Sequence, residues 1–264
     1  MNPISFASGI VPEFGPVDTI EAARAGGFDM VGLWVDPLEW TAAHTRDARA
    51  ALAATGLPLL DVEVVWIKPD SIIDDHRKII DVGTELGAAN VLCVSSDPDH
   101  ARTAAHLATL CRHAEASGMR VALEFGIFTE VKDLTAALAI LDQVAHPLRA
   151  LLIDPIHVDR SGTTVAQIAK VDPALLPYAQ FCDARALRPD PADFDAVINP
   201  PHGSILAVGA GIKKPVVLKD GTVGVATVMS MTLSVDHRVI DGALGAEFLK
   251  AIVENLENPI TMLA

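Results

Sequence analysis

The chain has 264 residues, of which 50% are hydrophobic, 20% are charged and 5% are aromatic. This length accommodates one or two domains, and the composition excludes a largely disordered chain. The 34 acidic residues outnumber the 20 basic ones, and the resulting net charge of -14 argues against nucleic acid and membrane surfaces as partners, because both are anionic.

The three cysteines, Cys93, Cys111 and Cys182, have no spacing typical of a disulfide framework or a structural zinc site. The first 15 residues contain neither a basic segment nor a long apolar run, so a signal peptide is not expected. Apolar runs elsewhere are shorter than the roughly 20 residues that cross a bilayer. We therefore expect a cytoplasmic protein without a membrane segment.

The first 187 residues alternate short apolar segments with amphipathic patterns, which is typical of a parallel sheet covered by helices. The apolar segments predict seven strands over 5–11, 29–35, 58–67, 90–96, 120–127, 150–154 and 178–183. The amphipathic patterns predict helices over 17–26, 41–55, 72–87, 101–117 and 129–146. Seven strands are one fewer than a closed barrel needs, so the expected fold is α/β, an incomplete TIM-type β/α barrel.

The composition changes after Leu187 to a segment rich in proline and aspartate, which disfavours both helix and central strand. We expect a domain over 1–187, a junction over 188–192 and a second domain over 193–264. Strict alternation over 222–236 predicts one long antiparallel strand. A closing helix should follow, with a buried apolar side formed by Ile240, Leu244, Phe248, Ala251 and Ile252.

Polar side chains end several of the predicted barrel strands, which is where parallel barrels carry their catalytic groups. They are Glu63, Glu124, Asp154, Gln180 and Asp183, with His157 three residues after Asp154. Carboxylates converging from separate strands suit Mg²⁺ or Mn²⁺, which would polarise a carbonyl or hold an enediolate. The pattern indicates proton transfer next to a carbonyl, although any one of these carboxylates alone would equally suit a helix cap.

The segments LDVE, VALEF, LLIDPIHVDRSG and AQFCDA make residues 1–187 resemble the xylose isomerase-like barrel family of sugar isomerases, epimerases and dehydratases. The resemblance implies that Glu124, Asp154 and Gln180 hold the metal and that His157 faces the substrate. We expect Glu63 and Asp183 to bind the substrate. The family's fourth ligand, a Glu near the end of the eighth strand, has no counterpart, because the resemblance stops before that strand.

A second pair of residues, His237 and Asp241, lies four residues apart where the long strand is expected to turn into the last helix. At a helix start they share a face, so a neutral imidazole could act as a base toward a thiol or hydroxyl beside a carboxylate that fixes its geometry. An isolated pair of this kind is more often a strand-end histidine bonded to backbone.

The sequence around this pair, FDAVINPPHGSILAVGAG, KKPVV and GTVGVATVMSMTLSVDHRVIDGALGAEFL, resembles the end of the acyltransferase (E2) catalytic domain of 2-oxoacid dehydrogenase complexes. The resemblance implies an α+β segment of the chloramphenicol acetyltransferase-like fold. His237 would be the base toward the thiol of CoA or dihydrolipoamide, and Asp241 the structural carboxylate. The same resemblance implies a trimer, or components of a 2-oxoacid dehydrogenase complex, as partners.

One departure from that family concerns the residues that stabilise the oxyanion of the tetrahedral intermediate in acyl transfer. Its Ser/Thr-bearing segment should lie just before residue 193, but residues 183–187 read DARAL and carry no hydroxyl. Loss of one oxyanion donor costs about 10²–10³ in rate. Three functions therefore stay open: an acyltransferase relative, a metal-dependent isomerase, epimerase or dehydratase of small sugars, and a fusion without turnover.

Overall fold

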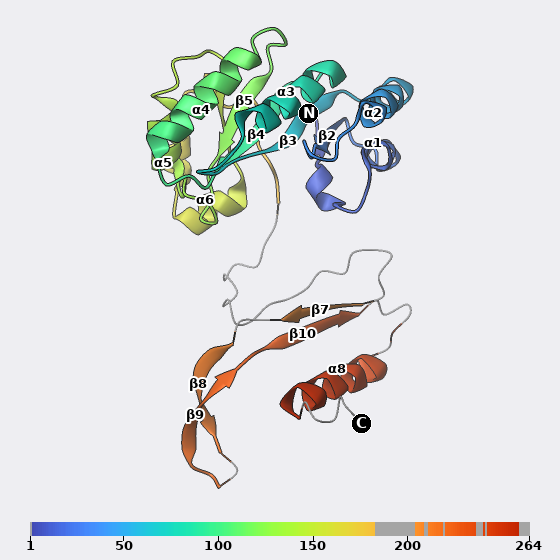
Figure 1. The fold of residues 1–264 in the computed structure, drawn as a ribbon, viewed down its shortest axis with the longest axis vertical. Helices are drawn as coiled ribbons and strands as arrows, with labels where there is room; N and C mark the ends of the chain where they lie inside the picture. Colours follow the sequence, from blue (N-terminus) through green and yellow to red (C-terminus); the bar gives the residue numbers. More distant parts are fainter. Residues whose placement is uncertain are drawn as a thin grey trace. The chain divides into compact units, whose positions relative to one another are not determined.

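The computed structural model describes residues 2–182, 204–208, 211–218, 220–235, 240 and 242–258. The chain divides into two compact units, unit 1 over Met1–Ala184 and unit 2 over Arg185–Ala264. Figure 1 shows the strands and helices of each unit. In the described part of the chain, no helix is long and apolar enough to cross a membrane.

Unit 1 contains a parallel sheet of six strands in sequential order, β1-β2-β3-β4-β5-β6. The strands are β1 (Ser5–Phe6), β2 (Met30–Trp34), β3 (Leu59–Ile67), β4 (Asn90–Ser95), β5 (Arg120–Glu124) and β6 (Arg149–Leu152). Helices connect consecutive strands (Figure 1), as the predicted alternation requires. The carboxyl ends of these strands therefore lie at the same edge of the sheet.

The helices of unit 1 are α1 (Pro16–Ala25), α2 (Ala42–Thr55), α3 (Ile73–Leu86), α4 (His100–His113), α5 (Leu134–Leu141), α6 (Pro155–Ser161) and α7 (Val165–Ile168). Two 3-10 turns, η1 (Ser8–Ile10) and η2 (Pro173–Leu175), accompany them. The apolar stripes of the longer helices pack on the sheet, so that Ile79 of α3, Leu107 of α4 and Ile140 of α5 are almost fully buried. Burying a side chain of this size contributes about 1.5–3 kcal/mol.

The expectation of seven strands in the first part of the chain is wrong for the described residues of unit 1, which contain six. Segment 178–182 makes only an isolated parallel bridge, between Ala179 and Ile153. Pro177 precedes this segment and has no N–H to donate, and the amide of Gln180 makes the one added bond, to the carbonyl of Ile153 at 2.9 Å. The barrel is therefore open at β6 in the part of the chain that the structure describes.

The helix expected over 129–146 is shorter than its apolar pattern suggested. Its first five residues form a turn in which the Thr129 hydroxyl donates to the carbonyls of Gly126 and Val131. Asp133 then caps the helix, because its carboxylate accepts from the amide of Ala136 at 2.9 Å. Side-chain bonds to the backbone therefore set the start of α5.

Unit 2 contains two antiparallel pairs of strands and one helix. The strands are β7 (Ser204–Val208), β8 (Ile212–Val217), β9 (Val223–Val228) and β10 (Met231–Val235), and the helix is α8 (Gly242–Glu257). β7 pairs with β10, and β8 pairs with β9. The single long strand predicted over 222–236 is thus two strands with different partners, separated at residues 229–230.

The prediction that the last helix buries its apolar side is also wrong in part. Leu244 and Phe248 are 54% and 51% exposed. Of the described residues in unit 2, only Ala207 and Gly245 are buried. Two two-stranded sheets and one helix enclose too little volume to remove large side chains from water. The chloramphenicol acetyltransferase-like fold remains a prediction.

Candidate functional site

Three side chains from the carboxyl edge of the unit 1 sheet bring potential metal ligands together. Glu124 is the last residue of β5, Asp154 follows β6 by two residues, and His157 lies in the first turn of α6. One ligand atom from each of these residues lies within 4.8 Å of the others. We refer to Glu124, Asp154, His157 and Gln180 as the strand-end site.

Asp154 has two roles in this site. Its Oδ1 accepts from the amide of Ile156 at 2.7 Å and so caps α6. Asp154 is therefore a helix cap, as a strand-end carboxylate can be. The capping bond fixes the orientation of its side chain and leaves Oδ2 available to the strand-end site. The same cap places His157 beside it, since α6 begins at Pro155.

Gln180 reaches the site through the bridge between Ala179 and Ile153. In the orientation of its amide that satisfies both carboxylates, its nitrogen donates to Oε1 of Glu124 at 3.2 Å and to Oδ2 of Asp154 at 3.1 Å. A half-turn of the same amide would present its oxygen instead, which is the atom that binds a cation. The structure thus brings together all four residues predicted for metal binding and for facing the substrate.

The environment of Glu124 is electrostatically unfavourable for an ionised carboxyl. Burial, and after it the negative charge of Asp154, raises the pKa of Glu124 to about 8. Burial lowers the pKa of His157, which therefore carries a neutral imidazole near pH 7. Carboxylates that repel one another beside a neutral imidazole form a donor set that a divalent cation would stabilise.

Glu63 is not one of the three residues whose ligand atoms lie within 4.8 Å of one another, and it forms an acidic pair with Asp61. The negative charges of this pair also help, after burial, to raise the pKa of Glu124. The Ser8 hydroxyl donates to Oε1 of Glu63, and the Tyr178 hydroxyl donates to Oδ2 of Asp61 at 2.9 Å. Burial is the main reason that the pKa of Asp61 rises to about 7 and that the pKa of Glu63 is also raised. The acidic pair therefore holds a proton within the sheet interior near neutral pH.

Asp61 and Tyr178 were not predicted from the sequence. Asp61 precedes Glu63 by two residues in LLDVE, and residues two apart in a strand point to the same face. That spacing was the signal for Asp61. Nothing local in the sequence indicates its pairing with Tyr178, which lies 117 residues away.

A cavity of about 510 Å³ adjoins the acidic pair. It is lined by the chain from η1 to the start of α1 and from the end of β2 to the start of α2, and Ser8 is both part of its wall and the donor to Glu63. The lining combines aromatic side chains, including Trp34 and Trp40, with the polar groups of Asp36 and His44. Such a lining suits a small polar molecule that also presents C–H surface.

Two aromatic side chains, Phe128 in the loop after β5 and Trp66 near the end of β3, extend from His157 of the strand-end site. The ring of Phe128 lies 5.0 Å from that of His157 and 6.1 Å from that of Trp66. The Trp66 indole donates to the Ser96 hydroxyl at 2.9 Å, and Lys68 lies over its ring at 5.1 Å. These bonds hold a partly exposed aromatic wall beside His157.

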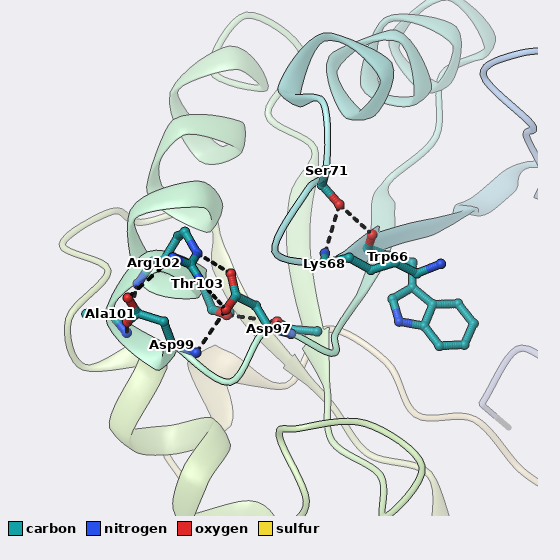
Figure 2. Close-up of polar contacts among 9 residues, drawn as sticks. Trp66, Lys68, Ser71, Asp97, Asp99, Ala101, Arg102 and Thr103 are labelled. Atoms are coloured by element: carbon teal, nitrogen blue, oxygen red, sulfur yellow. Dashed lines mark hydrogen bonds and ion pairs between the residues drawn. The ribbon is translucent and has the colours of Figure 1, made fainter.

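The loops that follow β3 and β4, next to Trp66, are fixed by short-range polar contacts (Figure 2). The Ser71 hydroxyl accepts from the amide of Lys68 at 2.8 Å and donates to the carbonyl of Trp66 at 3.2 Å. In the next loop, the buried carboxylate of Asp97 pairs with Arg102, which lowers the pKa of Asp97. Both loops are therefore held without a contribution from a ligand.

Three of the predicted site residues lie outside the described residues. They are Asp183, His237 and Asp241. Their predicted roles in substrate binding and acyl transfer remain predictions.

Residues 190–264 match the family described as 2-oxoacid dehydrogenases acyltransferase (catalytic domain). Over 71 residues the chain is 56% identical to the dihydrolipoyllysine-residue acetyltransferase component of the pyruvate dehydrogenase complex of Rhizobium meliloti, a match that covers 27% of this chain and 16% of that protein. The corresponding protein of Dictyostelium discoideum is 51% identical over 72 residues, with 26% of this chain and 11% of that protein covered. The chain thus spans under a fifth of the length of these relatives.

Solved structures resemble the other part of the chain. A xylose isomerase-like TIM barrel/4-hydroxyphenylpyruvate dioxygenase fusion protein matches with a TM-score of 0.62 and 21% identity, over 70% of this chain and 32% of that one. The 3-keto-D-glucoside 4-epimerase of E. coli matches with a TM-score of 0.58 and 16% identity, over 69% and 80% of the two chains. The IolI protein, solved with a zinc atom, matches with a TM-score of 0.57 and 16% identity, over 68% and 72%. At these identities the likeness shows the fold.

Proposed function

The chain joins a unit of xylose isomerase-like TIM-barrel fold to the end of an E2 acyltransferase catalytic domain, and we propose that it is a fusion of two chemistries. Unit 1 would use a divalent cation for proton transfer next to a carbonyl in a sugar-like small molecule. Unit 2 would contribute to acyl transfer between dihydrolipoamide and CoA. The observation that carries the first proposal is the convergence of Glu124, Asp154 and His157 within 4.8 Å.

The residues present fit a divalent cation. Glu124 and Asp154 offer oxygens, His157 offers a neutral nitrogen, and Gln180 can turn its amide oxygen toward them. Mg²⁺ and Mn²⁺ favour such oxygen-rich sets, and imidazole also suits Zn²⁺. When bound, the cation would polarise the substrate's carbonyl and so acidify the adjacent C–H bond.

The remaining residues would move the proton and hold the substrate. The Asp61 carboxyl exchanges its proton near pH 7, because burial raises its pKa to about 7, so it is suited to pass a proton to or from the neighbouring Glu63. Glu63 itself would face the substrate. The aromatic wall of Phe128 and Trp66 would exclude water beside His157 and cover the C–H face of a sugar.

Calorimetry with Mn²⁺ on the full chain tests the cation site. Glu124→Gln removes one charged ligand while keeping the shape of the side chain, and we expect affinity to fall by about ten-fold or more. Glu130→Gln is the matched control, since Glu130 is exposed and bonded to Lys132 outside the strand-end site. Equal affinity for all three proteins would refute the proposed site.

The second function is favoured by the identity of 56% to an acetyltransferase component over 71 residues. On this proposal, His237 deprotonates the thiol of CoA or dihydrolipoamide and Asp241 fixes the local geometry. The chain would associate as a trimer or with components of a 2-oxoacid dehydrogenase complex, in the cytoplasm. These assignments come from the resemblance over residues 193–264.

An assay with dihydrolipoamide and acetyl-CoA tests this second function. Activity should disappear in His237→Ala and persist in His146→Ala, because His146 lies in unit 1. Equal activity with and without His237 would remove that residue from the mechanism. If the native chain shows neither Mn²⁺ binding nor acyl transfer, the fusion is inactive and both proposals fail.

A further inference from the structure

A thiol lies beside the strand-end site. Sγ of Cys182 donates to Oδ1 of Asp154 at 3.0 Å, two residues after Gln180 contacts the other oxygen of the same carboxylate. The other two cysteines, Cys93 and Cys111, are fully buried in the hydrophobic core. Cys182 is therefore the only one of the three with a carboxylate partner and access to solvent.

We propose that Cys182 is a ligand of the cation in unit 1, which makes the site selective for thiophilic divalent ions, Zn²⁺ and Co²⁺, over Mg²⁺ and Mn²⁺. This inference rests on the proposed function, because it takes the group of Glu124, Asp154 and His157 as a cation site. That group is independent of the cysteine, since its three ligand atoms already lie within 4.8 Å of one another. Glu124 is also only 5% exposed, so its carboxylate points into the site and away from bulk water.

The spacing between sulfur and oxygen suits two ligands of one ion. Zinc–sulfur bonds are about 2.3 Å long and zinc–oxygen bonds about 2.0–2.2 Å, so two such ligands at angles between 90° and tetrahedral lie roughly 3.0–3.7 Å apart. The distance from Sγ of Cys182 to Oδ1 of Asp154 is 3.0 Å. Asp154 and Cys182 could therefore share an ion with little change in their separation. The sulfur would have to move toward Glu124 and His157, since it lies outside the group whose ligand atoms are within 4.8 Å of one another.

The chemistry of the donors explains the selectivity. A thiolate is a soft ligand that binds Zn²⁺ and Co²⁺ strongly and contributes little to the binding of Mg²⁺ or Mn²⁺. The imidazole of His157 favours the same transition metals. On binding, the S–H bond of Cys182 breaks, the sulfur–metal bond forms, and the proton leaves to solvent. No oxidant or reductant is required.

The test compares the full chain with Cys182→Ser, which keeps a hydroxyl donor to Asp154 but removes the soft atom. Titration with Co²⁺ should produce a near-ultraviolet thiolate-to-cobalt absorption band in the native chain and none in Cys182→Ser. Affinity for Zn²⁺ should fall by about ten-fold or more in the variant. Affinity for Mn²⁺ should stay the same, because the oxygen and nitrogen ligands remain. Circular dichroism checks that the variant folds.

The outcomes separate this inference from the proposed function. If Co²⁺ binds without the absorption band, or if Zn²⁺ affinity is unchanged in Cys182→Ser, the thiol is no ligand and the oxygen-rich site stands alone. If neither Zn²⁺ nor Mn²⁺ binds to the native chain, the cation site itself is wrong, and the role of Cys182 is refuted with it. If Glu124→Gln abolishes the band together with binding, the thiol and the carboxylates belong to one site.

Discussion

The hydroxyl of Tyr178 donates a 2.9 Å hydrogen bond to Oδ2 of Asp61, which joins the segment after η2 to strand β3. Asp61 is 5% exposed, and burial, with the nearby charge of Glu63, raises its pKa to about 7. The bond to Tyr178 acts in the opposite direction and stabilises the ionised form. The position of Tyr178, in the segment after η2, therefore influences whether Asp61 is protonated.

Asp61→Asn should stabilise the protein at pH 8. The pKa of Asp61 is raised from 3.8 in folding, so its contribution to stability is fully present below about pH 4 and is lost as pH rises through 7. An asparagine cannot ionise and still accepts from Tyr178, so the free energy of unfolding at pH 8 should increase by about 1–4 kcal/mol. Urea unfolding at pH 5 and pH 8 measures it. Equal effects at both pH values would contradict the assigned protonation.

Gly32→Ala should destabilise unit 1 through lack of space. A Cβ at Gly32 in β2 would lie 2.4 Å from Oδ1 of Asp61, so the buried carboxylate or the strand has to move. We expect a loss of about 1–3 kcal/mol in thermal or urea unfolding. Gly9→Ala is the matched control, because a Cβ at Gly9 meets nothing within 4 Å. If Gly32→Ala and Gly9→Ala lowered the stability equally, crowding of the new Cβ against Asp61 would not be the cause.

Replacing Val223 and Val225 by threonine should reduce self-association. These β9 side chains are 73% and 74% exposed, and exposed apolar patches on a strand favour association with other chains. Threonine keeps the β-branched shape, so circular dichroism should not change. Sedimentation should show smaller species than for the native chain. Thr227→Ser, on the same exposed face of β9, should leave the association unchanged.

Limited proteolysis should first cut between residues 187 and 202. Pro189 and Pro191 disfavour regular structure there, and exposed irregular segments are cleaved before packed helices. The products should be one fragment close to unit 1 and one close to unit 2. First cuts within α2 or α4, with 187–202 protected, would require an integrated fold in place of a junction over 188–192.

The sequence by itself determined the alternation of strands and helices in unit 1, because a helix and a strand each impose their own period on neighbouring residues. It also indicated that polar side chains near the strand ends would converge, because the carboxyl ends of parallel strands share an edge, but the selection of Glu124, Asp154 and Gln180 from that wider set came from the family resemblance. The alternation and the convergence need only local spacing and one rule of sheet geometry.

The tertiary structure alone decided which side chains pair across the sheet and which apolar faces are covered. The bond from Tyr178 to Asp61 and the contact of Cys182 with Asp154 depend on where segment 178–182 lies beside Ile153, directly after β6, and that segment makes a single parallel bridge there. The exposure of Val225 likewise depends on what packs against β9. Periodicity shows that a residue has a preferred face, but burial requires a second element opposite that face.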